Sequence, residues 1–218
     1  MRKKLKKALA WLKERPFYIR RAWVRRRIKS RDFTVISNNC WAGRVYQYLD
    51  MPYLSPTAGL YFFAEDYVKF VSNLRHYLET PLRFIPAEES KYYEEIKRRN
   101  QTDKPIGLLD DVEIVFLHYP TAEEAAEKWN RRAARVNYDH LIFKFSNMNL
   151  CTEDHMARFD AFPFDHKFVL SNRRHAKYNS EVYWPGYDDK PEIAADTNPF
   201  PGKLNLVRLL NKKHRKGE

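Results

Sequence analysis

The sequence predicts an α/β fold: a three-layer, Rossmann-like domain whose mostly parallel sheet is flanked by helices. Its hydrophobic share of 44% and aromatic share of 15% are typical of a globular protein. From residue 33 onward, short runs rich in β-branched and aromatic residues alternate with amphipathic stretches of helical period. The connections between these runs are short, which favours parallel strands joined by right-handed helical crossovers.

Each element has its own signal. Apolar residues recur at helical spacing across 64–81, and a proline closes that stretch. Thr121 followed by Glu124 is a capping-box pattern that begins a helix. The predicted elements in chain order are a strand at 33–37, helices at 40–49 and 64–81, a charged surface helix with a loop at 86–104, a strand ending at His118 with a hairpin partner before it, a helix at 120–137, a strand at 140–146, a helix at 152–163, a strand at 166–172 and a short helix at 204–211.

Charge divides the chain into two parts. Residues 1–31 hold fourteen of the 40 Lys and Arg but one of the 28 acidic residues, so this segment carries +13 and the remainder −1. We therefore expect a basic amphipathic arm, residues 1–31, followed by a single α/β domain, residues 32–218, whose carboxyl-terminal tail wraps the surface. The two cysteines lie far apart and form no disulfide or metal pattern, which indicates a reducing compartment.

The residue pattern of the arm predicts a binding partner. Its Leu, Ile and Trp residues lie among Lys and Arg at helical spacing, a pattern typical of helices that lie on an anionic membrane surface. A solvated tail and a nucleic-acid-binding segment are the alternatives, although the body has no RNP-like sequence or zinc knuckle and we expect no specific nucleic acid. No apolar run reaches the ~20 residues of a membrane span. We expect a cytoplasmic protein at the inner face of the cell membrane.

Polar residues follow the predicted strands, where ligands of open parallel sheets bind. The first strand leads into a turn that opens a helix, whose free amides favour anions, and Gly43 there allows a close approach. The candidate ligand-binding residues at these strand ends are Ser37, Asn38, Asn39, Gly43, Tyr119, Ser146 and Asn147.

Cys40 and His118 are the candidate catalytic residues. A cysteine at a helix amino terminus is expected to have a lowered pKa, and His118 could act as its base from another strand. Equally, an asparagine before the helix could cap it while Cys40 fills space as a small apolar residue. Both interpretations of Cys40 stay open.

The helix after His118 carries a candidate phosphate site. Arg132 and Arg135 are three residues apart and so share a side of that helix, where they could clamp a phosphate or carboxylate. The sequence contains no GxGxxG, P-loop, GxSxG or HExxH motif, and we expect neither a cofactor nor a bound metal.

Several stretches together resemble a bacterial family, domain of unknown function 1919, whose members are associated with exopolysaccharide biosynthesis. The resemblance covers about residues 33–175 and implies a role in making capsule, lipopolysaccharide or another surface polysaccharide. It adds Ser55 and Thr57 to the candidate binding residues. The stretches that carry it are ISNNCWAG, YLSPTAGLYFFAEDYVKFVSNL, GLLDDVEIVFLHY, EEAAEKWNRRAARVNYDHL and CTEDHMARFDAFPF.

These observations together predict a peripheral membrane transferase that moves a glycosyl, phosphoryl or acyl group to a glycan or its lipid-linked precursor. The expected ligand is a glycan or a nucleotide sugar, and His118 is the expected general base. Two alternatives stay open: a non-catalytic sugar-binding or scaffold protein of a polysaccharide assembly complex, and a Cys-His hydrolase or acyltransferase unrelated to glycans.

Overall fold

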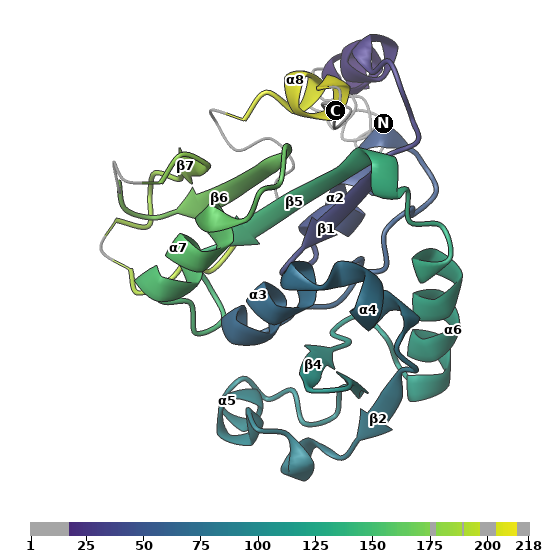
Figure 1. Cartoon of the computed structure of the whole chain (residues 1–218), viewed down its shortest axis with the longest axis vertical. Coiled ribbons are helices and arrows are strands. Elements are labelled where there is room, and N and C mark those ends of the chain that lie inside the picture. The colour runs from purple at the N-terminus through teal and green to yellow at the C-terminus, as the bar shows by residue number, and fades with distance from the viewer. Residues whose placement is uncertain (1–17, 175–177, 189, 197–203, 213–218) are drawn as a thin grey trace, which may run out of the picture.

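A four-stranded parallel sheet is the centre of the molecule (Figure 1). The computed structural model describes residues 18–174, 178–188, 190–196 and 204–212. All neighbouring strands of this sheet run parallel, which confirms the predicted α/β class, while the Rossmann-like arrangement stays a prediction. In spatial order the strands are β1 (Thr34–Ser37), β5 (Leu141–Ser146), β6 (Lys167–Ser171) and β7 (Glu181–Tyr183).

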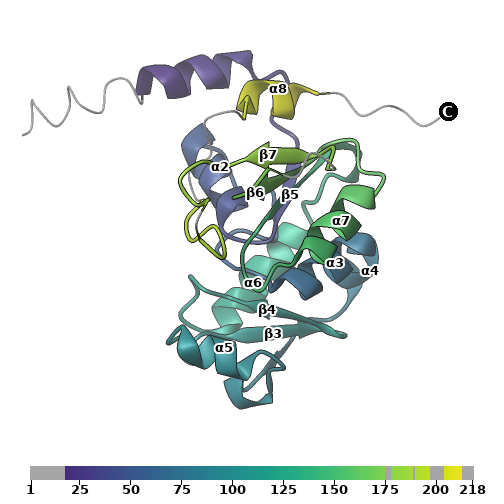
Figure 2. The same cartoon turned by 90° about the vertical axis from the view of Figure 1, so that its left-hand side faces the viewer.

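The sheet buries both of its faces. Successive strand residues point to opposite sides, so Ile142 joins one apolar cluster while Phe143 joins the other. One cluster includes side chains of α2 (Trp41–Leu49) and α8 (Leu206–Asn211). The opposite cluster is built with α3 (Ala64–Ser72), α6 (Ala122–Ala133) and α7 (Glu153–Ala161). Figure 2 shows α2 and α7 on opposite sides of the sheet. Burial on both sides explains why these strands read as nearly continuous apolar runs.

A second, antiparallel sheet lies at the end of the molecule that also holds α5 (Tyr93–Arg98) (Figure 1). Its strands are β2 (Arg83–Ile85), β3 (Ile106–Leu109) and β4 (Val112–Val115), in that order. The strand predicted to end at His118 is therefore β4, which ends earlier and belongs to this sheet, so its inclusion in the parallel sheet was wrong. The predicted hairpin exists, because β3 and β4 pair directly.

The predicted helix at 64–81 is in fact two helices. Asn73 separates α3 from α4 (Leu74–Glu79) with φ −139° and ψ 52°, outside the helical region. Asparagine competes with helix hydrogen bonds through its own side chain, so a break at this residue is chemically reasonable. The apolar period continues through the break because both helices pack on the same cluster.

Two helices begin at threonine caps, as the sequence predicts. The Thr121 hydroxyl oxygen accepts a hydrogen bond from the backbone N–H of Glu124 at 3.2 Å. Thr152 caps α7 in the same way and forms a reciprocal capping box with His155. Each cap satisfies a backbone donor that the helix itself leaves unpaired.

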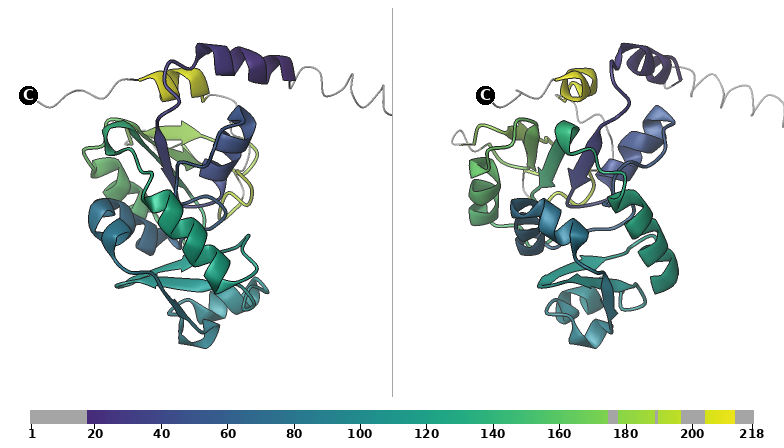
Figure 3. Two further views of the ribbon diagram at one scale, coloured as in Figure 1. Left: turned by 90° about the vertical axis from the view of Figure 1, so that its right-hand side faces the viewer. Right: turned by 45° about the vertical axis from the view of Figure 1, so that its right-hand side comes forward.

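The described part of the arm, residues 18–31, contains a helix over residues 18–27 that lies beside α8 (Figure 3). Val24 is 2% exposed and packs in the same cluster as α8. The side chain of Asn211 donates to the Arg27 carbonyl and accepts from the Lys29 N–H, both at 2.7 Å. The predicted first helix of the arm, before residue 18, lies outside the described residues. Within the described ranges, we find no helix with both the length and the apolar character needed to cross a membrane.

Candidate functional site

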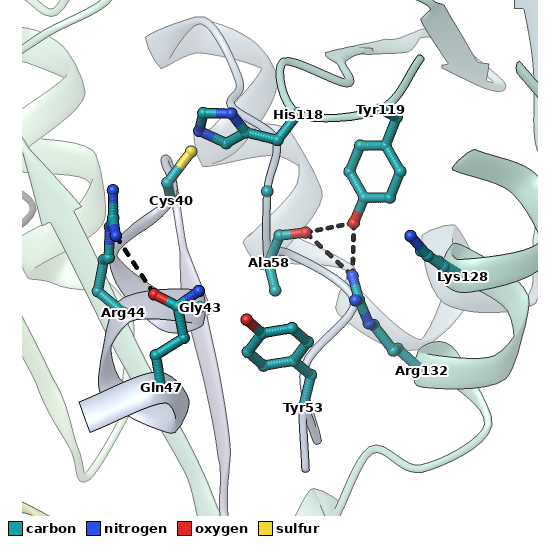
Figure 4. A pocket seen from close by; sticks show the side chains of 11 residues that line it. Cys40, Gly43, Arg44, Gln47, Tyr53, Ala58, His118, Tyr119, Lys128 and Arg132 are labelled. Carbon is teal, nitrogen blue, oxygen red and sulfur yellow. Dashed lines mark hydrogen bonds between the residues drawn. The ribbon is translucent and has the colours of Figure 1, made fainter. Parts of the chain in front are cut away.

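A pocket of about 280 Å³ opens between α2 and α6 (Figure 4). Two loops complete its wall, one leading from α2 towards α3 and one leading from β4 into α6. The lining residues are Cys40, Gly43, Arg44, Gln47, Tyr53, Ala58, Gly59, His118, Tyr119, Lys128 and Arg132.

Helical period selects the residues that the two helices contribute. Positions separated by three, four and seven residues lie on one side of a helix. Lys128 and Arg132 are one turn apart on α6 and therefore face the pocket together. The stripe along the beginning of α2 consists of Cys40, Gly43, Arg44 and Gln47.

Two glycines allow the loop between α2 and α3 to approach. A Cβ at Gly43 would lie 3.4 Å from the Cβ of Ala58, so the small residue lets the loop pack against the helix. Gly59 has φ +85°, which side chains rarely adopt, and a Cβ there would lie 3.0 Å from the Tyr119 ring. The Ala58 carbonyl points towards Tyr119 and Arg132 and accepts a hydrogen bond from each (Figure 4).

Arg132 is a buried cation with neutral partners. Its side chain is 6% exposed, and its Nη1 donates to the Ala58 carbonyl at 3.1 Å and to the Tyr119 hydroxyl. Its guanidinium lies 4.7 Å from the centre of the Tyr53 ring. Among the described residues no carboxylate pairs with it. Because an arginine stays charged even when it is buried, this arrangement favours a ligand that supplies the missing negative charge.

The pocket as a whole is electropositive. Arg44 and Lys128 join Arg132 in its lining, and no described residue that lines it is acidic. Lys128 pairs with Glu124 on the same helix. Among the described residues, the Arg44 side chain bonds only to the neutral Gln47, at 3.3 Å. In the described chain no group of three or more His, Cys, Asp or Glu is placed to hold a metal ion. The arrangement suits a phosphate or carboxylate, which arginine and lysine recognise.

His118 is held in its neutral form at the pocket rim. Partial burial lowers the pKa of this imidazole below its usual 6.5, and the nearby cations Arg44 and Lys104 lower it further. Within the described structure its ring makes no hydrogen bond. A neutral imidazole has one free nitrogen lone pair, so His118 can accept a proton from a ligand hydroxyl.

Cys40 is a protonated thiol, which makes the expectation of a lowered pKa wrong. Burial raises the pKa of Cys40 to about 11 and outweighs the opposing effect of the Arg44 cation. The sulfur contacts the Leu60 carbonyl at 3.7 Å and points towards the imidazole of His118 in Figure 4, although no hydrogen bond joins the two. Cys40 also precedes α2 without capping it through its side chain.

Most of the other predicted binding residues are buried beside the pocket and do not line it. Asn39 donates to Asp196 at 2.6 Å, and Lys144 donates to Asn39 at 2.9 Å and forms an ion pair with Asp196. Lys144 is fully buried, and burial lowers its pKa. The predicted residues in this buried polar layer are Ser37, Asn38, Asn39, Ser55, Thr57, Ser146 and Asn147.

These polar side chains hold the start of α2 and the loop between α2 and α3 in position. Ser37 accepts from the Ala42 N–H at 3.1 Å and thereby satisfies a backbone donor in the first turn of α2. Thr57 accepts from the Ser37 N–H at 3.1 Å and bonds to Ser55, which ties the loop to β1. The expectation that ligands bind at the strand ends therefore identified buried residues that position α2 and the loop.

Sequence reasoning missed two of the three cations. Arg44 lies four residues after Cys40 and Lys128 lies four residues before Arg132, so helical spacing from a candidate residue could have found both. The predicted partner of Arg132 was Arg135, which does not line the pocket. Lys128, one helical turn before Arg132, lines the pocket with it instead.

Comparisons with known proteins give a family without an assigned activity. The family model described as "Domain of unknown function (DUF1919)" matches residues 14–203. A curated protein of Haemophilus influenzae, described as an uncharacterized protein, is 30% identical over 190 residues. That match covers 87% of this chain and 85% of the relative.

Proposed function

The chain belongs to the DUF1919 family, and from that premise we propose that its pocket binds the anionic part of a glycan precursor, such as the diphosphate of a nucleotide sugar. The observation that carries this proposal is the buried guanidinium of Arg132, which has neutral partners in a pocket lined by two further cations. The pocket geometry supports the anionic half of the proposal. The glycan half comes from the resemblance to proteins associated with exopolysaccharide biosynthesis.

The proposed reaction is group transfer to a glycan or its lipid-linked precursor. The acceptor hydroxyl gives its proton to the neutral imidazole of His118 while its oxygen forms a bond to the transferred group. The bond between that group and its phosphate breaks, and the phosphate leaves with the electron pair. Arg44, Lys128 and Arg132 stabilise the negative charge that develops on the leaving phosphate. Cys40 contributes a neutral thiol to the pocket wall.

We place this activity at the cytoplasmic face of the cell membrane, where lipid-linked precursors are found. The basic amphipathic arm, residues 1–31, supplies the attachment to the anionic surface. Its helix over residues 18–27 presents both arginines and large apolar side chains to solvent.

A ligand screen tests the pocket. Full-length protein is heated with inorganic pyrophosphate, a nucleotide sugar, a nucleotide or acyl-coenzyme A, and the shift of Tm is measured. A ligand held at 100 times its Kd stabilises the folded state by about 2.7 kcal/mol. We expect the nucleotide sugar to raise Tm most, and no shift with any of the four would refute the anionic pocket.

Charge-removing variants locate the binding site. Arg44→Gln and Lys128→Gln should each weaken binding of the stabilising ligand by about 10- to 150-fold, because a hydrogen bond to a charged group contributes about 1.5–3 kcal/mol. Arg131→Gln is the matched control, since Arg131 is on the same helix but pairs with Glu127 outside the pocket. Equal losses in Lys128→Gln and Arg131→Gln would contradict the assignment.

A non-catalytic binding protein is the second candidate. Catalytic histidines are usually oriented by a second group, and the His118 ring has no such hydrogen bond within the described residues. Cells that carry His118→Ala decide between the two. Loss of surface polysaccharide with intact ligand binding would support catalysis, whereas normal polysaccharide production would support the binding protein.

A further inference from the structure

A short segment, residues 190–196, crosses the carboxyl ends of three strands of the parallel sheet, and we call it the strap. An asparagine after each strand forms a hydrogen bond with the strap, at 2.6–2.8 Å. These asparagines are Asn172 after β6, Asn147 after β5 and Asn39 after β1. Ligands of open parallel sheets bind beyond the carboxyl ends of the strands. The strap therefore covers the place where the fold would bind a ligand.

The strap itself is held by few buried groups. Of its seven side chains, only Ile193 and Asp196 are buried. Glu192 adds one hydrogen bond, which its carboxylate accepts from the Asn149 N–H at 2.8 Å. Segments with few buried apolar contacts open at a lower free energy than the core. Because its displacement exposes one large apolar side chain, we expect the strap to detach while the sheet stays folded.

The Asp196 carboxylate fills a site made by three donors. Its Oδ1 accepts from the Asn39 amide at 2.6 Å, and its Oδ2 accepts from the Lys144 ammonium and the Ser146 hydroxyl. Lys144 and Ser146 are fully buried. Among the described residues, Asp196 is the one carboxylate that pairs with Lys144. An ammonium, a hydroxyl and an amide around two oxygens form a recognition site for a carboxylate.

A buried ion pair is a weak fastener for a segment. Loss of solvation offsets most of the attraction between the two charges, and apolar residues of similar volume are often at least as stabilising. The position of the pair indicates a further role. Asn39 bonds to both charged side chains and directly precedes Cys40, which lines the neighbouring pocket.

We infer that the strap is an autoinhibitory element and that Asp196 occupies the binding site of a ligand carboxylate. When the strap detaches, the carboxylate of a small organic acid takes the position of Asp196 and bonds to Lys144, Ser146 and Asn39. Lys144 thus has a counter-ion both in the closed state and in the ligand-bound state. This site is separate from the electropositive pocket and does not depend on the function proposed for that pocket.

Amide hydrogen exchange of the wild-type protein tests whether the strap opens. The Ile193 N–H bonds to the Asn147 carbonyl, and the Phe143 N–H, inside the sheet, bonds to the His166 carbonyl, both at 2.8 Å. We expect the Ile193 amide to exchange at least about 100-fold faster than the Phe143 amide when both are followed by NMR. Equal protection of the two amides would show that the strap opens only when the whole domain unfolds, and would overturn the inference.

Formate tests the carboxylate site in Asp196→Ala, which lacks the internal carboxylate. Sodium formate at ten times its Kd should raise the Tm of this variant by about 3–6 °C relative to sodium chloride of the same ionic strength. The site of the wild-type protein is filled, so its Tm should change by less than about 1 °C. If Asp196→Ala is unfolded without formate, recovery of its folded circular dichroism spectrum on addition of formate is the expected result.

Two variants serve as controls for the formate response. Asp188→Ala removes an exposed carboxylate that bonds to Tyr183 and to the Gly186 N–H, and it should not respond to formate. Asp196→Ala/Lys144→Met also removes the buried ammonium and should lose the response.

Three outcomes would overturn the carboxylate site. They are no response of Asp196→Ala to formate, an equal response of the double variant, and a larger response of Asp196→Ala to inorganic phosphate than to formate. The electropositive pocket is judged separately by the ligand screen and by Arg44→Gln and Lys128→Gln.

Discussion

At the scale of single residues, burial determines which charges the pocket can carry. It keeps Cys40 protonated and His118 neutral, because both groups lose solvation when they ionise. It cannot discharge Arg132, whose guanidinium stays protonated under all ordinary conditions. The pocket is therefore positive at neutral pH through its arginines and lysine, and its thiol is a poor nucleophile in the resting protein. A Cys-His hydrolase is correspondingly disfavoured.

The raised pKa of Cys40 predicts slow alkylation. A shift from 9.0 to about 11 lowers the thiolate fraction by ~100-fold at neutral pH. Iodoacetamide at pH 7.5 should modify Cys40 in the folded protein at least about 50-fold more slowly than in guanidinium chloride, as followed by mass spectrometry. Cys151 is the internal control, since burial raises its pKa to about 12. Rapid modification of Cys40 alone would restore the nucleophile hypothesis.

His118 predicts how anion binding depends on pH. Its pKa lies below 6.5, so it is neutral at pH 7 and becomes a cation as the pH falls below that value. An added positive charge should increase the affinity for sulfate, whose own charge is constant over this range, by about threefold to tenfold between pH 7 and pH 5. Calorimetric titration measures the affinity. His118→Gln should remove the pH dependence, and an unchanged dependence in that variant would exclude His118 as its source.

At the scale of elements, the sequence predicted those whose signals are local. Threonine caps and apolar periods located α6 and α7, and the longer buried strands β5 and β6 were found for the same reason. The strands β2 and β7 have three residues each, too few to show a period. Assignment of β4 to a second sheet depends on which strands pair, which is a property of the folded chain. The cations Arg44 and Lys128 were missed because their role appears only when α2 meets α6.

The cap of α6 predicts a measurable loss of stability. Thr121→Ala removes the acceptor for the Glu124 N–H and should lower the free energy of unfolding by about 1 kcal/mol in urea denaturation. Thr121→Ser keeps the hydroxyl and should recover most of the loss. Thr102→Ala, at an exposed turn residue, is the control and should change stability by less than about 0.5 kcal/mol. Destabilisation by Thr121→Ser equal to that of Thr121→Ala would argue against the cap.

At the scale of the whole molecule, a buried ion pair joins the carboxyl-terminal segment to the central sheet. Lys144 on β5 and Asp196 are 0% and 1% exposed, and Asn39 after β1 bonds to both. The pair holds Asp196 against the ends of β1 and β5, next to the turn that begins α2. The sequence did not predict this ion pair, because it joins residues 52 positions apart through side chains alone.

Removal of Asp196 alone should lower the free energy of unfolding more than replacement of both Asp196 and Lys144. Asp196→Ala leaves the Lys144 ammonium buried without a counter-ion and should lower the free energy of unfolding by about 3–5 kcal/mol. The double variant Asp196→Ala/Lys144→Met replaces the charge by an apolar chain of similar length and should recover at least about half of that loss. Urea denaturation measures both values. A double variant less stable than the single variant would show that Lys144 is not the source of the penalty.

The parallel pairing of β1 with β5 also governs the order in which the protein is assembled on the ribosome. Thr34 pairs with Leu141, 107 positions later, so β1 emerges long before its neighbour exists. At about 5–20 residues per second, that interval lasts roughly 5–20 s. Contacts of such high sequence separation form late and slow the folding of the whole domain. The first strand to be synthesised can therefore complete its pairing in the sheet only after β5 has been translated.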